Sequence, residues 1–148
     1  MWRCRGAAVA LPVLLGLVAA AVALVDGPSL PDPVAVHFTL GGRPDGTLGR
    51  PAFLTLLVAV PWISAAVMYT AVTLRPRWSS SLVGLVGMVA TSFTALGIVV
   101  ARSQVGLASW TEAHASLLRF VAGTAAALTV GGAAGWVVQR QGSSDPRP

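Results

Sequence analysis

Four long apolar runs constrain the fold of this chain more than any other feature. They cover residues 6–25, 52–74, 81–101 and 115–138, and none of them contains Asp or Glu. A bilayer core of about 30 Å needs about 20 apolar residues as helix, so each run is long enough to cross it. Backbone amides in hydrocarbon must be satisfied within their own segment, which favours helices. The sequence predicts an all-α membrane protein, a bundle of four transmembrane helices over residues 1–138.

The composition agrees with this class. Hydrophobic residues make up 55% of the chain and charged residues 10%, too few polar groups to cover a water-soluble fold. The arginines are scattered in ones and twos at the ends of the apolar runs, so we expect the lipid bilayer, and no nucleic acid, as the main partner. The single cysteine, Cys4, excludes an intramolecular disulfide and a Cys-based zinc cluster.

The arginines also predict an orientation in the cell membrane. Six lie on one predicted side and three on the other: Arg3, Arg5, Arg75, Arg77, Arg140 and Arg147 against Arg43, Arg50 and Arg102. The side richer in arginine is normally cytoplasmic, so both termini are predicted inside and residues 26–51 form an external loop. Residues 139–148 are polar and Pro-rich, which predicts a disordered cytoplasmic tail.

The first apolar run has a second interpretation. Arg3 and Arg5 precede it, and the segment 21–23 resembles the site at which a signal peptide is cleaved. The run is longer than the apolar core of a usual signal peptide, which favours a retained helix. Whether it is retained or cleaved stays open at this point.

The loop after the first run carries a second periodicity. Apolar residues Val34, Val36, Phe38 and Leu40 alternate with Ala35, His37 and Thr39, which is typical of an extended strand. The segments 41–42 and 44–46 then predict consecutive turns. An isolated strand is marginal in water, so we expect its apolar face to rest on the membrane interface or on the helix ends. His37 would then face water or a polar partner.

The same loop resembles part of a known family. Its residues Leu30, Pro31, His37, Phe38, Gly42, Pro44, Asp45 and Gly46 are spaced as in the N-terminal domain of unknown function of SdpI-type bacterial immunity and signalling membrane proteins. Thr39 stands where that family usually has Asn, and Arg50 where it often has Lys. The resemblance covers about the first half of the chain. The whole chain has four predicted helices, fewer than the SdpI-type immunity proteins. It implies that these loop residues form a binding or structural motif, and that the chain serves in immunity or signalling with a secreted peptide or a membrane partner.

The acidic residues and the histidine of the loop raise the question of a metal site. His37 and Asp45, with Asp32 or Asp26, are suitable zinc ligands. One histidine with acids in a Pro/Gly-rich loop lacks a recognisable ligand spacing, so a structural role is preferred and no metal is expected. In that role Asp45 caps its turn and His37 bonds to a loop carbonyl or to an arginine.

Two further candidates lie in the last run and just before it. Arg119 is the one formal charge inside any run, and an arginine at the centre of a span costs about 2.5–3.5 kcal/mol on insertion scales. It either reaches back to the interface or pairs with Asp45 or Glu112 and fixes the loop over the bundle. The segment from Ser109 to Glu112 matches a capping box for the last helix.

Small residues at four-residue spacing predict close helix contacts. They form two stripes, Gly123, Ala127, Gly131 and Gly135 in the last run and Gly87, Thr91 and Ala95 in the third. Packing inside one bundle is preferred over a homodimer seam, and the oligomeric state stays undetermined.

No enzyme motif is present in the sequence, so we expect neither a catalytic residue nor a cofactor. The preferred function is a non-enzymatic membrane module that senses or binds an external peptide through residues 30–46. The alternative is a small-molecule membrane transporter, although no run holds the carboxylate that proton coupling usually requires. A third class is a metal-dependent membrane hydrolase that uses His37 and Asp45.

Overall fold

The computed structural model of the protein describes residues 2–74, 79–114, 116, 118, 121–126, 128–129, 132–133 and 136. Its elements, in chain order, are α1 (Trp2–Val25), η1 (Gly27–Ser29), β1 (Val34–Phe38), β2 (Pro44–Leu48), α2 (Arg50–Leu74), α3 (Ser79–Arg102) and η2 (Trp110–Glu112), where η marks a short 3-10 helix.

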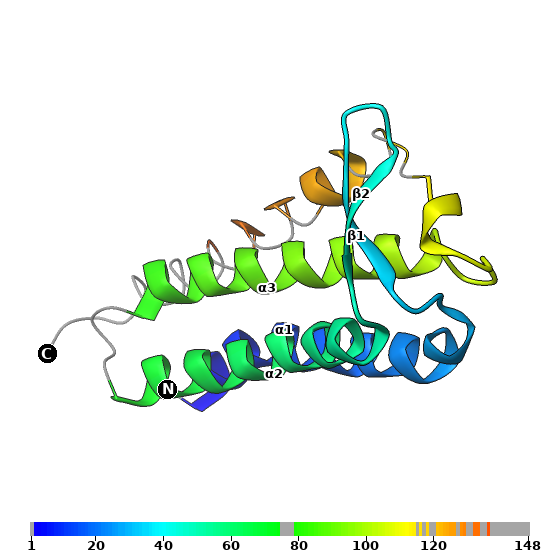
Figure 1. Ribbon diagram of the computed structural model, residues 1–148. Helices are drawn as coiled ribbons and strands as arrows, with labels where there is room; N and C mark the ends of the chain where they lie inside the picture. The colour runs from blue at the N-terminus through cyan, green and yellow to red at the C-terminus, as the bar shows by residue number, and fades with distance from the viewer. Residues whose placement is uncertain are drawn as a thin grey trace, which may run out of the picture.

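The three long helices lie side by side, and each contacts the other two (Figure 1). α1 and α3 run in one direction and α2 in the other. The end of α1, the start of α2 and the end of α3 therefore meet at one end of the molecule, and the strands β1 and β2 stand there (Figure 1). We call this the hairpin end. The expectation of a mostly helical chain is confirmed.

Two of the helices are long and apolar enough to cross a membrane. The segments are Arg50–Ala71 of α2 and Gly84–Arg102 of α3, each with a mean hydropathy of 2.0. The apolar part of α1, Val9–Val25, is shorter. Residues 121–126 of the fourth run are helical, whereas Arg119, part of that run and the tail 139–148 lie outside the described residues.

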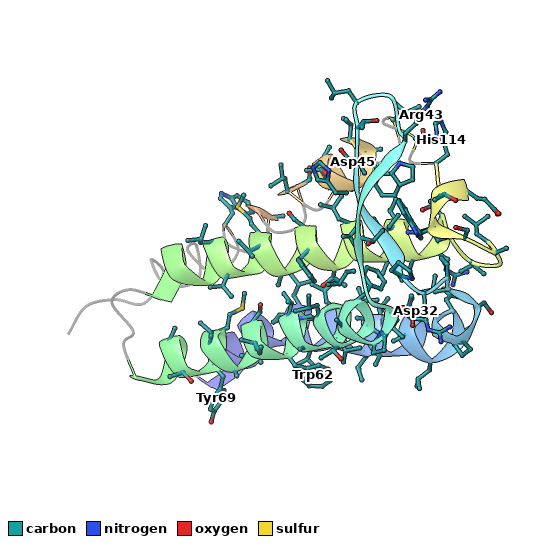
Figure 2. The ribbon with its side chains drawn as sticks, in the orientation of Figure 1. Asp32, Arg43, Asp45, Trp62, Tyr69 and His114 are labelled. Atoms are coloured by element: carbon teal, nitrogen blue, oxygen red, sulfur yellow. The ribbon has the colours of Figure 1, made fainter. Side chains whose placement is uncertain are left out.

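The faces of α2 and α3 that point away from the other helices are apolar. Their exposed side chains include Leu56, Trp62 and Ile63 on α2 and Leu85, Val89 and Phe93 on α3. Figure 2 shows Trp62 and Tyr69 pointing away from the helices. Only 33% of each of the two apolar segments is buried inside the chain. A core helix of a water-soluble protein buries such a surface, so these faces fit an apolar environment.

Glycines allow the helices to approach closely. A Cβ atom placed on Gly97 of α3 would lie 2.7 Å from Cδ1 of Leu57 on α2, and one on Gly87 would lie 3.2 Å from Cε of Met68. Leu57 and Met68 are almost fully buried. Gly87, from the third-run stripe of small residues, thus packs inside the chain. In the last-run stripe only Gly123 is described, and its added Cβ would lie 3.7 Å from Val99.

The loop after α1 contains a two-stranded antiparallel sheet, which an all-α class does not include. β1 pairs with β2 in the register Val34 with Leu48, Ala35 with Thr47, His37 with Gly46 and Phe38 with Pro44. The turn predicted over residues 44–46 is wrong, because these residues begin β2. They pair with β1, and this pairing outweighs their local preference for a turn.

The chain reverses between Thr39 and Arg43 instead. The Thr39 N–H donates to the Arg43 carbonyl at 2.8 Å, and the Gly42 N–H donates to the Thr39 carbonyl at 2.9 Å. Gly42 has φ 78°, a left-handed conformation that favours glycine. The turn signal at residues 41–42 is therefore confirmed, and Gly42 is the residue in it that requires glycine.

The predicted alternation along β1 holds only in part. Val34 is fully buried as expected, but Ala35 on the opposite face is fully buried too, and Leu40 is 92% exposed. The register shifts on either side of His37, which disrupts the two-residue period. Ala35 is buried because a segment far away in the sequence covers it.

Candidate functional site

The segment that covers Ala35 is the turn after α3, and its central residue is Gln104. The Ala35 N–H donates to Gln104 Oε1 at 2.8 Å, and Gln104 Nε2 donates to the Ala35 carbonyl at 2.8 Å. Nε2 also donates to the carbonyl of Val100 at 3.1 Å. Gln104 is fully buried. Its amide thus pairs with the outer edge of β1 as a neighbouring strand would, and it joins the hairpin to α3.

Sequence reasoning missed Gln104. The local signal is a lone amide shortly after a membrane-length run, and nothing near it in the sequence relates it to Ala35, which lies 69 residues away. A second contact of the same turn supports the attachment, since the Gly106 N–H donates to the carbonyl of Ser29 at 2.9 Å.

An ion pair joins the ends of α1 and α3. Asp26 Oδ2 lies 2.8 Å from Arg102 Nε, in a geometry that makes an ion pair without a well-aligned hydrogen bond. The Asp26 side chain is 6% exposed and the Arg102 side chain 63% exposed, so the pair lies at the surface with its acid inside. A buried carboxylate without a counter-charge is strongly disfavoured, so Arg102 allows Asp26 to be buried there.

The start of α2 is attached to the same loop. Asp32 Oδ1 accepts a hydrogen bond from the Arg50 N–H at 3.0 Å, which satisfies one of the free amides at the N-terminus of α2. The Arg50 guanidinium donates through Nη1 to the carbonyl of Leu30 at 3.1 Å. Leu30 is buried, and Pro31 next to it is buried as well. The Leu-Pro part of the motif is therefore in the packed base of the loop.

His37 and Asp45 form the polar face of the hairpin. The His37 Nδ1 and Asp45 Oδ1 atoms are 2.5 Å apart, and the side chains are 75% and 42% exposed. The carboxylate can only accept, so the ring donates through Nδ1 and leaves Nε2 facing outward. The prediction that His37 faces water or a polar partner is confirmed. The expected cap of a turn by Asp45 is wrong, because Asp45 lies in β2 and bonds to His37.

Gly46 lies opposite His37 across the hairpin. A Cβ atom on Gly46 would lie 2.9 Å from the Cβ of His37, closer than real side chains approach. Phe38, which pairs with Pro44, is partly buried against the apolar core of the hairpin end. Of the motif residues, Gly42 and Gly46 shape the backbone and Phe38 packs inward, whereas His37 and Asp45 point outward.

The capping box predicted for the last helix serves a different element. Ser109 is the N-cap of η2, and its Oγ accepts from the Thr111 N–H at 3.3 Å. η2 ends at Glu112, so the serine caps a short turn beneath the hairpin. The pairing of Arg119 with Asp45 or Glu112 involves a residue outside the described ones.

The acidic residues near the hairpin do not converge on a metal site within the described residues, where no group of three or more His, Cys, Asp or Glu side chains comes together. Asp26 pairs with Arg102 and Asp32 with the start of α2. Asp45 and His37 contact only each other among these groups.

Comparison with known protein families gives a match over part of the chain. Residues 13–60 match a family described as a domain of unknown function, DUF1648. These residues include most of α1, the hairpin and the first part of α2. No curated protein and no solved structure is similar enough to this chain to count as a match.

Proposed function

We propose that this chain is a bacterial plasma-membrane protein with four spans and both termini in the cytoplasm, related to the SdpI-type family. In this proposal the hairpin faces outward and recognises a secreted peptide, in a non-enzymatic role in immunity or signalling. The first helix is retained in this proposal and not cleaved as a signal peptide, because α1 packs along both α2 and α3.

The membrane part of the proposal is supported by the outward faces of α2 and α3. They carry large apolar side chains, and only 33% of each apolar segment is buried inside the chain. Exposed apolar surface of this extent is stable in hydrocarbon and unfavourable in water. The Asp26–Arg102 pair and the hairpin lie at one end of these helices, where polar groups would meet the aqueous interface.

One observation supports the recognition role above all others: the hairpin is anchored to the helices and carries an exposed polar pair. Gln104, which is fully buried, holds β1 through two hydrogen bonds to Ala35 and bonds to Val100 of α3 with a third. His37 and Asp45 are bonded to each other and exposed on the same hairpin. A polar pair fixed on a rigid support loses little conformational entropy on binding, which favours recognition.

The test uses labelled peptides purified from the culture medium of the source organism and intact cells that express the protein. We expect His37→Ala and Asp45→Asn each to reduce peptide binding at least about tenfold, the effect of losing one charge-assisted hydrogen bond. Thr47→Ala is the matched control, because Thr47 is exposed on β2 and does not belong to the pair.

Cell-surface protein levels and protease resistance of the hairpin are compared for all variants. Reduced binding with unchanged protease resistance supports recognition by the pair. If both variants bind the labelled peptides as the wild type does, the hairpin is a structural element and the recognition proposal is wrong.

A further inference from the structure

Most ionisable side chains at the hairpin end have a partner within the molecule. The partnered groups are Asp26 with Arg102, His37 with Asp45, Asp32 with the amide of Arg50, and the Arg50 guanidinium with the carbonyl of Leu30. These contacts account for the folded loop and leave few charges free to meet another molecule.

At the hairpin end, three of the ionisable side chains that the structure describes lack such a partner: Arg43, Glu112 and His114. All three line the same hollow, which has a volume of ≈ 480 Å³ and lies between the tip of the hairpin and η2. Figure 2 shows Arg43 and His114 close together at the tip. Groups of opposite charge that share a hollow without pairing leave both charges available to a ligand.

The walls of the hollow add apolar surface between the charges. Pro44 comes from β2 and Trp110 from η2. An indole ring offers a large apolar face and also attracts a cation. The volume falls in the range of about 300–1,000 Å³ that is common for small-ligand sites, and a few polar groups on an apolar wall are their usual arrangement.

We propose that this hollow binds a short peptide segment that carries both a carboxylate and an ammonium group. Arg43 binds the carboxylate, because a guanidinium matches a carboxylate with two parallel hydrogen bonds. Glu112 binds the ammonium group, and Trp110 covers the chain between the two charges. The inference deepens the proposed function, on which it rests for the class of ligand, and names a site separate from the His37–Asp45 pair.

The experiment measures binding of alanine peptides of two to four residues to the full-length protein in detergent micelles by titration calorimetry. Each peptide is used with both ends free, with its amino end acetylated, and with its carboxyl end amidated. We expect the free form to bind and each blocked form to bind at least about tenfold more weakly, since each block removes a charge-assisted hydrogen bond.

Two variants connect each end of the peptide to its residue. Arg43→Gln should weaken binding of the peptide with both ends free and abolish the preference for a free carboxyl end. The preference for a free amino end should persist. Glu112→Gln should do the reverse. Thr47→Ala is the control and should keep both preferences, because Thr47 is exposed on β2 and does not line the hollow.

The proposal is overturned if no peptide binds at millimolar concentration. It is equally overturned if the two variants weaken binding without a change in the preference for either end. These outcomes are distinct from a failure of hairpin recognition, because the binding of secreted peptides to the His37 and Asp45 variants is measured separately. If the His37 and Asp45 variants lose binding of secreted peptides while no alanine peptide binds the wild type, the proposal for the hollow is wrong and the proposed function stands.

Discussion

Replacement of Gln104 by Ala should release the hairpin from the helices. The substitution removes the side-chain amide that accepts from the Ala35 N–H and donates to the Ala35 carbonyl, and Ala35 itself is fully buried. Leaving a buried polar group without a partner costs about 1–3 kcal/mol, so two such groups cost about 2–6 kcal/mol. The lost bond to Val100 adds less, since that carbonyl also accepts from the Ser103 hydroxyl at 2.8 Å.

Hydrogen exchange of the Ala35 amide in detergent micelles measures this effect directly. A loss of 2 kcal/mol in local stability corresponds to about thirtyfold faster exchange, and larger losses to more. The α2 and α3 amides far from the hairpin should exchange at unchanged rates, because the helices do not depend on the hairpin for their own hydrogen bonds.

Ser103→Ala is the matched control for Gln104→Ala. Ser103 is the preceding residue, and its hydroxyl donates to the carbonyl of Val100 at 2.8 Å within the same turn. Its loss should change Ala35 exchange less than threefold. If Gln104→Ala also leaves Ala35 exchange within threefold of the wild type, the amide does not hold the hairpin and the anchoring argument is refuted.

Two glycine substitutions test the close approaches in the fold. Gly46→Ala should lower the melting temperature by forcing a Cβ atom to within 2.9 Å of the His37 Cβ, with an overpacking cost of about 1–3 kcal/mol. Gly41→Ala serves as its control, because its Cβ would be 3.8 Å from the nearest atom; an equal drop for both would contradict the steric explanation. Gly97→Ala should destabilise the contact of α2 with α3 by a similar amount, since the added Cβ would lie 2.7 Å from Cδ1 of the buried Leu57. Thermal unfolding in micelles measures this effect. An unchanged melting temperature would mean that Leu57 moves aside.

Some of the candidate site could be predicted from sequence because its signals are local. The turn at Gly42 follows from a glycine pair between apolar runs, and its positive φ explains the requirement. The exposure of His37 follows from its position among apolar neighbours in an extended segment. Each of these signals depends on residues within a few positions of one another.

Other parts of the site could not be predicted, because they depend on contacts between distant segments. Residues 44–46 have the composition of a turn, yet they form a strand because β1 is available to pair with them. Ala35 has no local reason to be buried, and it is buried because Gln104 reaches it from the end of α3. The hollow lined by Arg43 and Glu112 likewise joins two segments that are far apart in the sequence.

The helical class and the apolar character of the long helices could be inferred from sequence alone. Both follow from the period and composition of single runs, since a helix satisfies its hydrogen bonds within its own segment. The strand pairing, the attachment of the hairpin by Gln104 and the partners of the charged side chains depend instead on how distant segments pack together. A strand edge and a buried charge need partners from elsewhere in the chain, and only the packing of the helices decides which residues come within reach.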